Sequence, residues 1–254
     1  MKQKLHKNSN FDIQGYNVIR SNLKVGKEGI LVAAKQGTFN SIEKTYEAES
    51  RNLTTVEIKY PEDTLSVVVV HGPQEEAQQE IREEFYEDLK AEVERCVASG
   101  NRLLITGDFN ARLEHDEGNL KASKGNGKQL QEVVEMYGLK VLNIDPHTDG
   151  KWTRIQKKGN EYCKSVIDFI ITDGSTQKKT NKVTIDEDKM YTPYRNKKEG
   201  KNSTLVFTDH CTMTTSIKIR KGADENKQKP QKMKVWMIEE DGLKEFKKLT
   251  EGDV

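Results

Sequence analysis

The chain has 254 residues, of which 33% are hydrophobic and 33% are charged, and its 42 basic residues nearly balance its 41 acidic ones. Globular domains are usually about 45–50% apolar, so we expect one large domain diluted by polar stretches. The start carries no apolar segment typical of a secretion signal, and no apolar run approaches the roughly 20 residues that span a membrane. The scattered cysteines favour buried thiols over a disulfide framework or a zinc site. We therefore expect an intracellular protein, in the nucleus or the cytoplasm, that is neither secreted nor bound to a membrane.

Three strands are predicted in the first third of the chain, at residues 30–34, 53–58 and 65–70. Branched apolar residues are frequent in them, and polar or turn-forming residues bound them. The third is apolar almost without interruption, which predicts a strand buried on both faces. The Gly-Pro pair that follows leaves His71 at the end of this strand.

A long helix is predicted over residues 74–99, because apolar residues recur there at every fourth position. The expected buried stripe consists of Ala77, Ile81, Phe85, Leu89, Val93 and Val97. Many acidic residues surround this stripe. Because they are spread over the polar positions, a solvated helix face is favoured over a metal or cation site.

The rest of the core is predicted to alternate between strands and one more helix. A strand at residues 102–106 runs directly into the sequence Gly-Asp-Phe-Asn, and a second helix is predicted over residues 128–137. Further strands are predicted at residues 139–142, 166–171, 205–207 and 214–219. Long strands joined by two helical crossovers indicate a layered α/β domain over about residues 10–220.

Two basic segments accompany this core. Residues 174–203 form a polar insertion with eight Lys or Arg residues against four acids, and basic residues also dominate residues 220–234. We interpret the second segment as a flexible linker, followed by a short helix at residues 235–249. Because Lys and Arg neutralise phosphates, both segments are candidate contacts to DNA or RNA, without sequence preference and with a steep dependence on salt.

Asp108 and Asn110 are the first residues that can carry chemistry. Both follow a buried strand, and their spacing of two places both side chains on one side of an extended chain. A carboxylate that transfers protons, beside an amide that donates to a phosphate oxygen, suits a phosphodiester substrate. Taken alone, this short pattern is more often an ordinary turn.

Asp168 and His210 are the second pair of candidates. Asp168 lies in an apolar strand, where an unpaired carboxylate would be costly. A histidine partner would satisfy this carboxylate and orient the imidazole. The alternative is that Asp168 binds a backbone amide or an arginine, and the sequence spacing leaves both open.

Three motifs, in this order, resemble the endonuclease/exonuclease/phosphatase superfamily. They are the GDFNA segment that begins at Gly107, the S-x-I-D-F-I strand that begins at Ser165, and Thr208-Asp209-His210 in place of the family's S-D-H. Residues 127–154 further resemble the endonuclease domain of non-LTR retrotransposon polyproteins. The resemblance implies a four-layer α/β sandwich of two mixed β-sheets flanked by helices over residues 1–220. Residues 221–254 would then be a basic linker and short helix leading toward a downstream domain.

The resemblance also implies Mg²⁺-dependent hydrolysis of a phosphodiester, as in a DNA-nicking endonuclease without a small-molecule cofactor. Asp108 would activate the water or protonate the leaving oxygen, and Asn110 would position the phosphate. His210, held by Asp168, would stabilise the scissile phosphate or shuttle protons there. Asp209 would lie near the metal. At the end of the strand over residues 65–70, His71 stands where the family often has a tyrosine, and it can still donate to a phosphate.

The metal-binding glutamate of the family has no counterpart in this sequence. Its place falls near residues 2–4, where no acid occurs, and the first strand of the family fold is also missing. We therefore expect a chain truncated at its N-terminus, with weakened or lost Mg²⁺ binding and impaired activity. The alternative function is a non-catalytic remnant that at most binds nucleic acid. A phosphatase acting on a small or lipid phosphate is a third reading, which the retrotransposon-like segment disfavours.

The central expectation is spatial. The side chains of Asp108, Asn110, Asp168, Asp209 and His210 should converge at one end of the sandwich. Each of them ends or lines a predicted strand, and a phosphate needs several donors at once.

Overall fold

The computed structural model describes residues 13–22, 29–50, 52–113, 125–190, 194–199, 202–219 and 233–235. Its centre is a six-stranded sheet in the order β3-β4-β5-β6-β10-β7. These strands are β3 (Ser41–Glu47), β4 (Leu53–Tyr60), β5 (Asp63–His71), β6 (Arg102–Asp108), β10 (Asp168–Thr172) and β7 (Lys140–Val141). The sheet is mixed, because β5 and β6 run parallel whereas the other neighbouring pairs are antiparallel.

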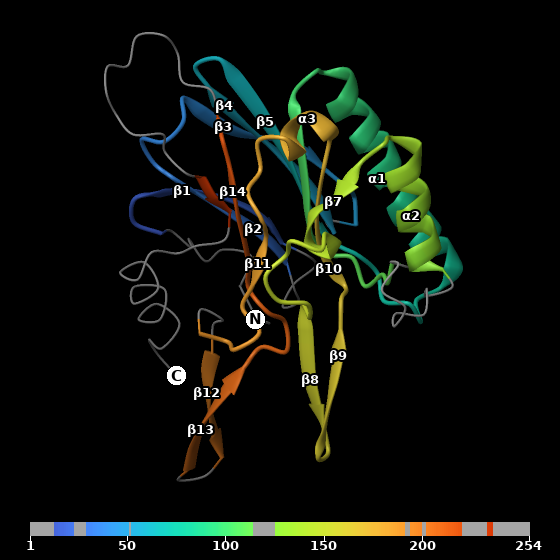
Figure 1. The fold of residues 1–254 in the computed structure, drawn as a ribbon, viewed down its shortest axis with the longest axis vertical. Helices are drawn as coiled ribbons and strands as arrows, with labels where there is room; N and C mark the ends of the chain where they lie inside the picture. Colours follow the sequence, from blue (N-terminus) through green and yellow to red (C-terminus); the bar gives the residue numbers. More distant parts are fainter. Residues whose placement is uncertain are drawn as a thin grey trace.

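Helices α1 (Gln79–Ala98) and α2 (Asn126–Met136) cover one face of this sheet (Figure 1). The middle of the predicted stripe on α1 is buried as expected, at Phe85, Leu89 and Val93. The stripe is wrong at its two ends, because Ile81 and Val97 are each 47% exposed. A four-residue step overshoots one helical turn by about 40°, so a stripe with this spacing rotates away from the sheet along a helix of this length.

The acidic residues of α1 are mostly solvated, with one exception. Glu92 is 2% exposed, and its carboxylate pairs with the guanidinium of Arg95 at 2.8 Å. Arg95 also reaches Glu57 on β4, at 3.4 Å. Arg95 therefore supplies the partner that the buried carboxylate requires and also joins the helix to the sheet.

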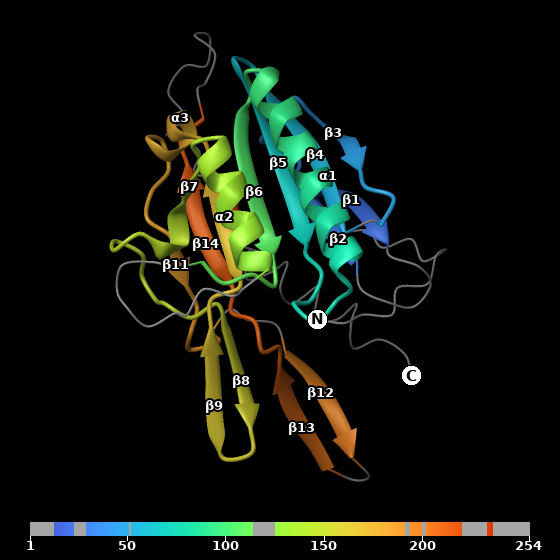
Figure 2. The ribbon, with the colours of Figure 1, turned by 90° about the vertical axis from the view of Figure 1, so that its right-hand side faces the viewer.

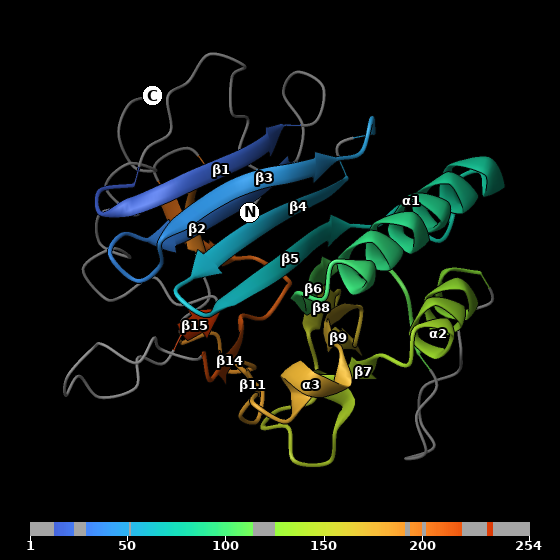
Figure 3. The same cartoon turned by 90° about the horizontal axis from the view of Figure 1, so that it is seen from above.

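The opposite face of the central sheet packs against a second layer of strands (Figure 3). This layer contains two small sheets, formed by β1 (Tyr16–Asn22) with β2 (Gly29–Lys35), and by β11 (Thr184–Ile185), β14 (Met213–Ile217) and β15 (Met233–Val235). β5 is buried on both faces, because Val68 and Val70 pack toward the helices whereas Val67 and Val69 pack toward the second layer. This explains its unbroken apolar run and confirms the predicted α/β sandwich.

Two hairpins project from the same end of the molecule (Figure 1 and Figure 2). The first, β8 (Arg154–Lys158) with β9 (Glu161–Ser165), precedes β10. The second, β12 (Tyr194–Glu199) with β13 (Asn202–Phe207), precedes the segment that carries His210. Three of the four hairpin strands were missed from the sequence, because strands outside the core lack the apolar pattern that identifies a strand. The strand predicted at residues 205–207 forms the second half of β13.

The interpretation of residues 174–203 as a polar insertion is wrong in part. This segment begins with the short helix α3 (Gly174–Gln177), in which Thr176 is fully buried. It continues into β11, and Val183 and Ile185 are buried in the core of the second layer. About half of the supposed insertion is therefore part of the folded domain.

The predicted linker is also corrected at one place. Met233–Val235 forms β15, which pairs with β14, although the sequence had placed it in the linker and at the start of a helix. Residues 220–232, the rest of the predicted helix and the vicinity of residues 2–4 lie outside the described residues, so the domain boundary at residue 220 and the missing glutamate stay predictions.

The predicted strands differ from those of the structure by one to three residues at their ends. The strand predicted at residues 139–142 is only two residues long as β7, because Leu142–Ile144 turns into the 3₁₀ helix η1. The last predicted strand begins one residue earlier and ends at Ile217. No helix among the described residues is long and apolar enough to cross a membrane.

Candidate active site

Three neighbouring strands of the central sheet bring polar residues to the same end. Asp108 is the last residue of β6, and it lies beside His71, the last residue of β5, in the parallel ladder. Asp168 is the first residue of β10 and is the direct antiparallel partner of Asp108. The register of the sheet alone therefore gathers three of the predicted site residues.

The glycines beside these residues are required by close backbone packing. Gly107 has a φ of +144°, and a Cβ atom there would collide with the carbonyl oxygen of Val70. At Gly72, a Cβ atom would lie 2.6 Å from the carbonyl oxygen of Phe109. The amide of Gly72 donates to the carbonyl oxygen of Asp108 at 2.7 Å. Glycine thus allows the ends of β5 and β6 to lie in direct backbone contact at the site.

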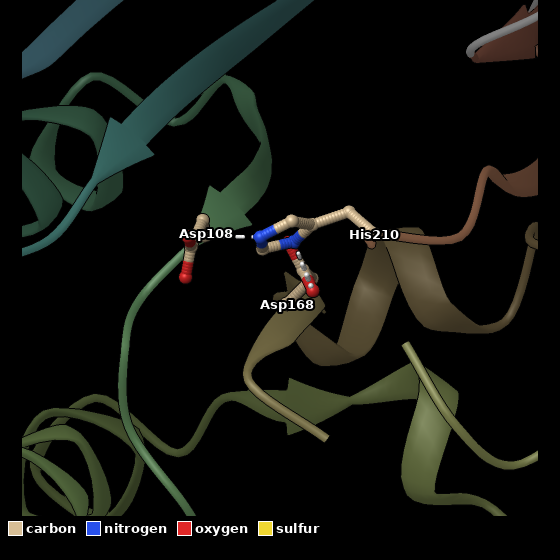
Figure 4. A group of neighbouring side chains, drawn as sticks. All are labelled: Asp108, Asp168 and His210. Carbon is tan, nitrogen blue, oxygen red and sulfur yellow. Dashed lines mark hydrogen bonds and ion pairs between the residues drawn. The ribbon is translucent and has the colours of Figure 1, made fainter. Parts of the chain in front are cut away.

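The predicted pairing of Asp168 with His210 is present (Figure 4). Nδ1 of His210 lies 2.9 Å from Oδ1 and 3.0 Å from Oδ2 of Asp168. Asp168 is buried, at 9% exposure, so the carboxylate obtains the partner that its apolar surroundings demand. A carboxylate can only accept, so Nδ1 carries the proton and donates, and Nε2 is directed toward Asp108.

Two buried side chains hold the backbone of Asp168, and neither was predicted from the sequence. Oγ1 of Thr153 accepts from the amides of Ile167 and Asp168, at 3.0 and 3.1 Å. Asn143 donates from Nδ2 to the carbonyl oxygen of Asp168 at 3.0 Å and accepts from the amide of Ile170 at 2.9 Å. These side chains continue the hydrogen bonding along the edge of β10 that β7 is too short to supply. Their partners are distant backbone groups, which leave no periodic pattern in a sequence.

Asp108 faces the same imidazole from the other side. Its Oδ2 atom lies 3.7 Å from Nε2 of His210. Burial and the charge of Asp168 raise the pKa of Asp108 to about 6, against the opposing influence of His210, the Asn110 amide and His71. Burial disfavours the imidazolium of His210, but its hydrogen bond to Asp168 and the surrounding carboxylates outweigh this and raise its pKa. Asp108 therefore exchanges protons close to neutral pH, and the carboxylates around His210 favour its protonated form.

Asn110 lies at the site but has backbone partners there. Asn110 adopts a left-handed φ of +46°, and its backbone amide donates to Oδ1 of Asp108 at 2.9 Å. Its side-chain Nδ2 donates to the carbonyl oxygen of Gly72 at 2.9 Å. Asn126, at the start of α2, donates to the carbonyl oxygens of Asn110 and Pro73, at 3.1 and 2.8 Å. Asn110 thus lies in a turn, as the alternative interpretation of this motif expected, and the same turn places it beside Asp108. A phosphate-positioning role for Asn110 stays a prediction.

The structure gives Asp209 a different partner from the predicted metal. Nε of Arg154 donates to Oδ2 of Asp209 at 2.7 Å, and Asp209 does not join the group formed by the other three residues. Burial alone would raise the pKa of Asp209, but the hydrogen bond from Arg154 and the neighbouring positive charges hold it below its usual value. Four of the five residues therefore converge as predicted, whereas the Asp209 side chain bonds to the β8–β9 hairpin, and its role as a metal ligand stays a prediction.

The donor set is consistent with a divalent cation. Ligand atoms of Asp108, Asp168 and His210 all lie within 4.8 Å of one another. Carboxylate oxygens are the ligands that hard cations such as Mg²⁺ prefer, and a cation would relieve the repulsion that raises the pKa of Asp108. Because Asp168 is already bound to His210, Asp108 is the carboxylate that fits this role best.

Comparison with known folds gives relatives of similar overall size. The endonuclease domain of TRAS1, a telomere-specific non-LTR retrotransposon, is 18% identical with a TM-score of 0.56, over 82% of this chain and 82% of that chain. An AP endonuclease from Archaeoglobus fulgidus is 13% identical with a TM-score of 0.61, over 86% and 87% of the two chains. The 3′ phosphatase NExo from Neisseria, bound to a product DNA hairpin, is 13% identical with a TM-score of 0.59, over 84% and 85%. At these identities the likeness shows a common fold.

Comparison by sequence identifies the family. A search among curated proteins found no match. A family profile described as endonuclease-reverse transcriptase matches residues 67–213, which is more than half of the chain and includes Asp108, Asp168 and His210. The chain therefore belongs to the endonuclease-reverse transcriptase family, within the endonuclease/exonuclease/phosphatase superfamily that its motifs resemble.

Proposed function

We propose that this chain is a divalent-metal-dependent endonuclease that nicks DNA, of the kind found in retrotransposon polyproteins. Family membership supports phosphodiester hydrolysis in general. The observation that carries the proposal is the line of side chains from Asp168 through His210 to Asp108, with contacts of 2.9 and 3.7 Å. A carboxylate that orients an imidazole, with a second carboxylate near its free nitrogen, is an arrangement for moving protons.

His210 carries the central proton step in this proposal. Asp168 fixes the tautomer with the proton on Nδ1, so Nε2 is the atom that meets the substrate. In its charged form, the imidazole donates from Nε2 to a phosphate oxygen. Asp108, whose pKa is raised to about 6, accepts a proton from the attacking water or returns one to the leaving oxygen.

A divalent cation completes the proposed site. When bound at Asp108, with Asp209 as a further candidate, Mg²⁺ supplies positive charge that offsets the charge developing on the phosphate oxygens. We expect its affinity to be low, because Asp168 is engaged by His210 and Asp209 by Arg154. The missing glutamate also leads us to expect weak Mg²⁺ binding, but its place, near residues 2–4, lies outside the described residues.

Nucleic acid is the proposed partner. The β8–β9 hairpin lies next to the site, because Arg154 pairs with Asp209 and forms an isolated bridge with His210. The exposed lysines of this hairpin, Lys157 and Lys164, are candidate contacts to phosphates in DNA and also in RNA, and so is the basic segment of residues 174–203. We expect binding through them to weaken steeply with salt, because each neutralised phosphate releases counterions.

The test is a nicking assay on supercoiled plasmid with Mg²⁺, with EDTA, and with His210→Ala. The proposal expects relaxed circles with the wild-type chain and Mg²⁺, and at least about 100-fold slower nicking by the variant. Equal nicking in EDTA would contradict the metal requirement.

A non-catalytic role in nucleic-acid binding is the second candidate. The structural bonds of Asn110 to Gly72 and of Asp209 to Arg154 favour it, because both side chains would otherwise face the substrate. It expects salt-sensitive DNA binding without nicking at any Mg²⁺ concentration, so the same assay separates the two functions.

A further inference from the structure

The segment that carries His210 is held mainly through its backbone. It joins the β12–β13 hairpin to β14, and it crosses the end of the β8–β9 hairpin. The amide of Ile155 donates to the carbonyl oxygen of Asp209 at 2.7 Å, and the amide of Cys211 donates to that of Thr153 at 2.6 Å. These bonds fix one edge of the segment. They leave the carbonyl groups of Thr208 and His210 to be held by another donor.

Lys189 supplies that donor from a distant part of the chain. Its Nζ atom lies 2.6 Å from the carbonyl oxygen of His210, and 3.2 Å from the carbonyl oxygens of both Thr208 and Asp209. An ammonium group carries three N–H donors and no acceptor, which matches three converging carbonyl oxygens. Because the donor is charged, these bonds are stronger than bonds between neutral groups.

A tight turn over residues 186–190 holds the backbone of Lys189 in place. The residue has a left-handed φ of +59°, which is uncommon for a residue with a side chain. Its amide donates to the carbonyl oxygen of Asp186 at 3.2 Å, and Oδ1 of Asp186 accepts from the amide of Met190 at 2.9 Å. The turn starts directly after Ile185, which is buried, so Lys189 extends from a fixed point of the second strand layer.

The same turn fixes the other side of the site through a side chain of opposite charge. Oε1 of Glu187 accepts from the amide of Trp152 at 2.8 Å and also from the amide of Lys151. Those residues lead into Thr153, which holds the amide of Asp168. One turn thus bonds to the segment of His210 through an ammonium and, through a carboxylate, to the residues just before Thr153, which holds the amide of Asp168.

We propose that Lys189 is a positioning residue: its ammonium fixes the backbone of residues 208–210 and thereby holds the imidazole of His210 between Asp168 and Asp108. This inference rests on the proposed nuclease function for its kinetic consequence. Its structural consequence, the orientation of His210, is independent of any activity.

The test compares Lys189→Met with Lys59→Met. Methionine keeps most of the length of lysine but has no N–H donor. Lys59 is the matched control, because it lies on β4, outside the segments proposed to contact nucleic acid, and its ammonium forms an exposed pair with Glu43, at 2.6 Å. Both variants are measured for plasmid nicking with Mg²⁺ and, in metal-free protein at one pH, for the NMR resonance of the His210 ring N–H.

The expected result for Lys189→Met is a shifted or broadened His210 resonance and a fall of at least tenfold in kcat, with KM within twofold of wild type. Lys59→Met should match wild type in both measurements. An unchanged resonance and kcat in Lys189→Met would overturn the inference. If the wild-type chain does not nick DNA, the proposed function fails, and the resonance alone then decides the positioning role.

A second variant separates positioning from simple loss of folding. Lys189→Ala should regain a wild-type His210 resonance when propylammonium is added, because this cation replaces the deleted chain and its N–H donors. Tetramethylammonium, which has the charge but no donor, should have no effect. Equal rescue by both cations, or by neither in a folded protein, would overturn the hydrogen-bonding role of Lys189.

Discussion

Asp108 and Asp168 are direct partners across the antiparallel ladder of β6 and β10, so two carboxylates stand on adjoining strands at one end of the central sheet. Like charges placed opposite each other in a sheet are destabilising. The imidazole of His210 lies against both, with its Nδ1 atom on Asp168 and its Nε2 atom toward Asp108. Asp168 is therefore compensated by a direct hydrogen bond, whereas Asp108 keeps a raised pKa. The arrangement costs stability and, under the proposed function, places a carboxylate that can transfer a proton beside the substrate.

The first prediction is that Asp108→Asn stabilises the metal-free protein while it abolishes nicking. Ionised Asp108 is disfavoured in the folded state, because its pKa is raised from 3.8 to about 6 by burial and by Asp168. Its contribution to stability is complete below pH 3.8 and is lost as the pH rises through about 6. Asparagine removes this loss, which is at most about 3 kcal/mol for a shift of this size, so we expect a gain of about 1–3 kcal/mol at pH 7.5, measured by urea unfolding in EDTA.

The control for this prediction is Asp149→Asn, which changes an exposed carboxylate and should alter the free energy of unfolding by less than about 0.5 kcal/mol. The advantage of Asp108→Asn over wild type should disappear below about pH 4. A variant that is less stable than wild type at pH 7.5 would contradict the repulsion between the two carboxylates.

The second prediction concerns Thr153, whose hydroxyl accepts from two amides beside the site. Thr153→Val keeps the shape of the side chain but removes the hydroxyl. Because Thr153 is fully buried, both amides then lose their hydrogen-bond acceptor. We expect a loss of about 2–3 kcal/mol in the free energy of unfolding, measured by urea, and slower nicking. Thr153→Ser keeps the hydroxyl and should lose only about 1 kcal/mol, with nicking near wild type. Equal losses in the two variants would show that the hydroxyl does not hold these amides.

The third prediction concerns Asp173, which caps α3 and joins it to β6. Its carboxylate accepts from the amides of Ser175, Thr176 and Leu103. Burial opposes its charge, but these hydrogen bonds outweigh burial and lower its pKa to about 2. The stabilisation is therefore present above pH 3.8 and is lost as the pH falls through about 2.

Asp173→Asn should thus cost about 1 kcal/mol at pH 7, a value reduced for the partial exposure of the side chain. Urea unfolding between pH 2 and pH 7 is the measurement, and the difference from wild type should shrink toward pH 2. Asp188→Asn, at an exposed position in the same part of the chain, should show no difference at any pH. A constant penalty for Asp173→Asn across this range would refute the assigned pKa shift.

The central sheet and the Asp168–His210 pair could be predicted from the sequence, for two physical reasons. A strand buried on both faces must be largely apolar, and β5 is apolar from Leu65 to Val70 except at Ser66. A carboxylate in an apolar strand must find a partner, which made His210 the natural candidate for Asp168. The helical stripe failed only where a spacing of four drifts around α1.

The remaining contacts leave no such trace in the sequence. Asn143, Thr153 and Lys189 bond to backbone groups from distant segments, and any residue there would provide the same amide or carbonyl group. The pairing of Arg154 with Asp209 depends on where the β8–β9 hairpin crosses the segment of His210, which is a property of the assembled fold.

The most direct test of the account is single-turnover nicking of supercoiled plasmid with Mg²⁺ by wild type, Asp168→Asn, His210→Ala and the double variant. His147→Gln, which changes an exposed histidine, is the control and should nick as wild type does. If Asp168 acts through His210, each single variant loses about 10²- to 10⁴-fold, and the double variant loses little more than His210→Ala alone. Losses that multiply in the double variant, or wild-type nicking by His210→Ala, would contradict a site in which Asp168 orients His210 toward the scissile phosphate.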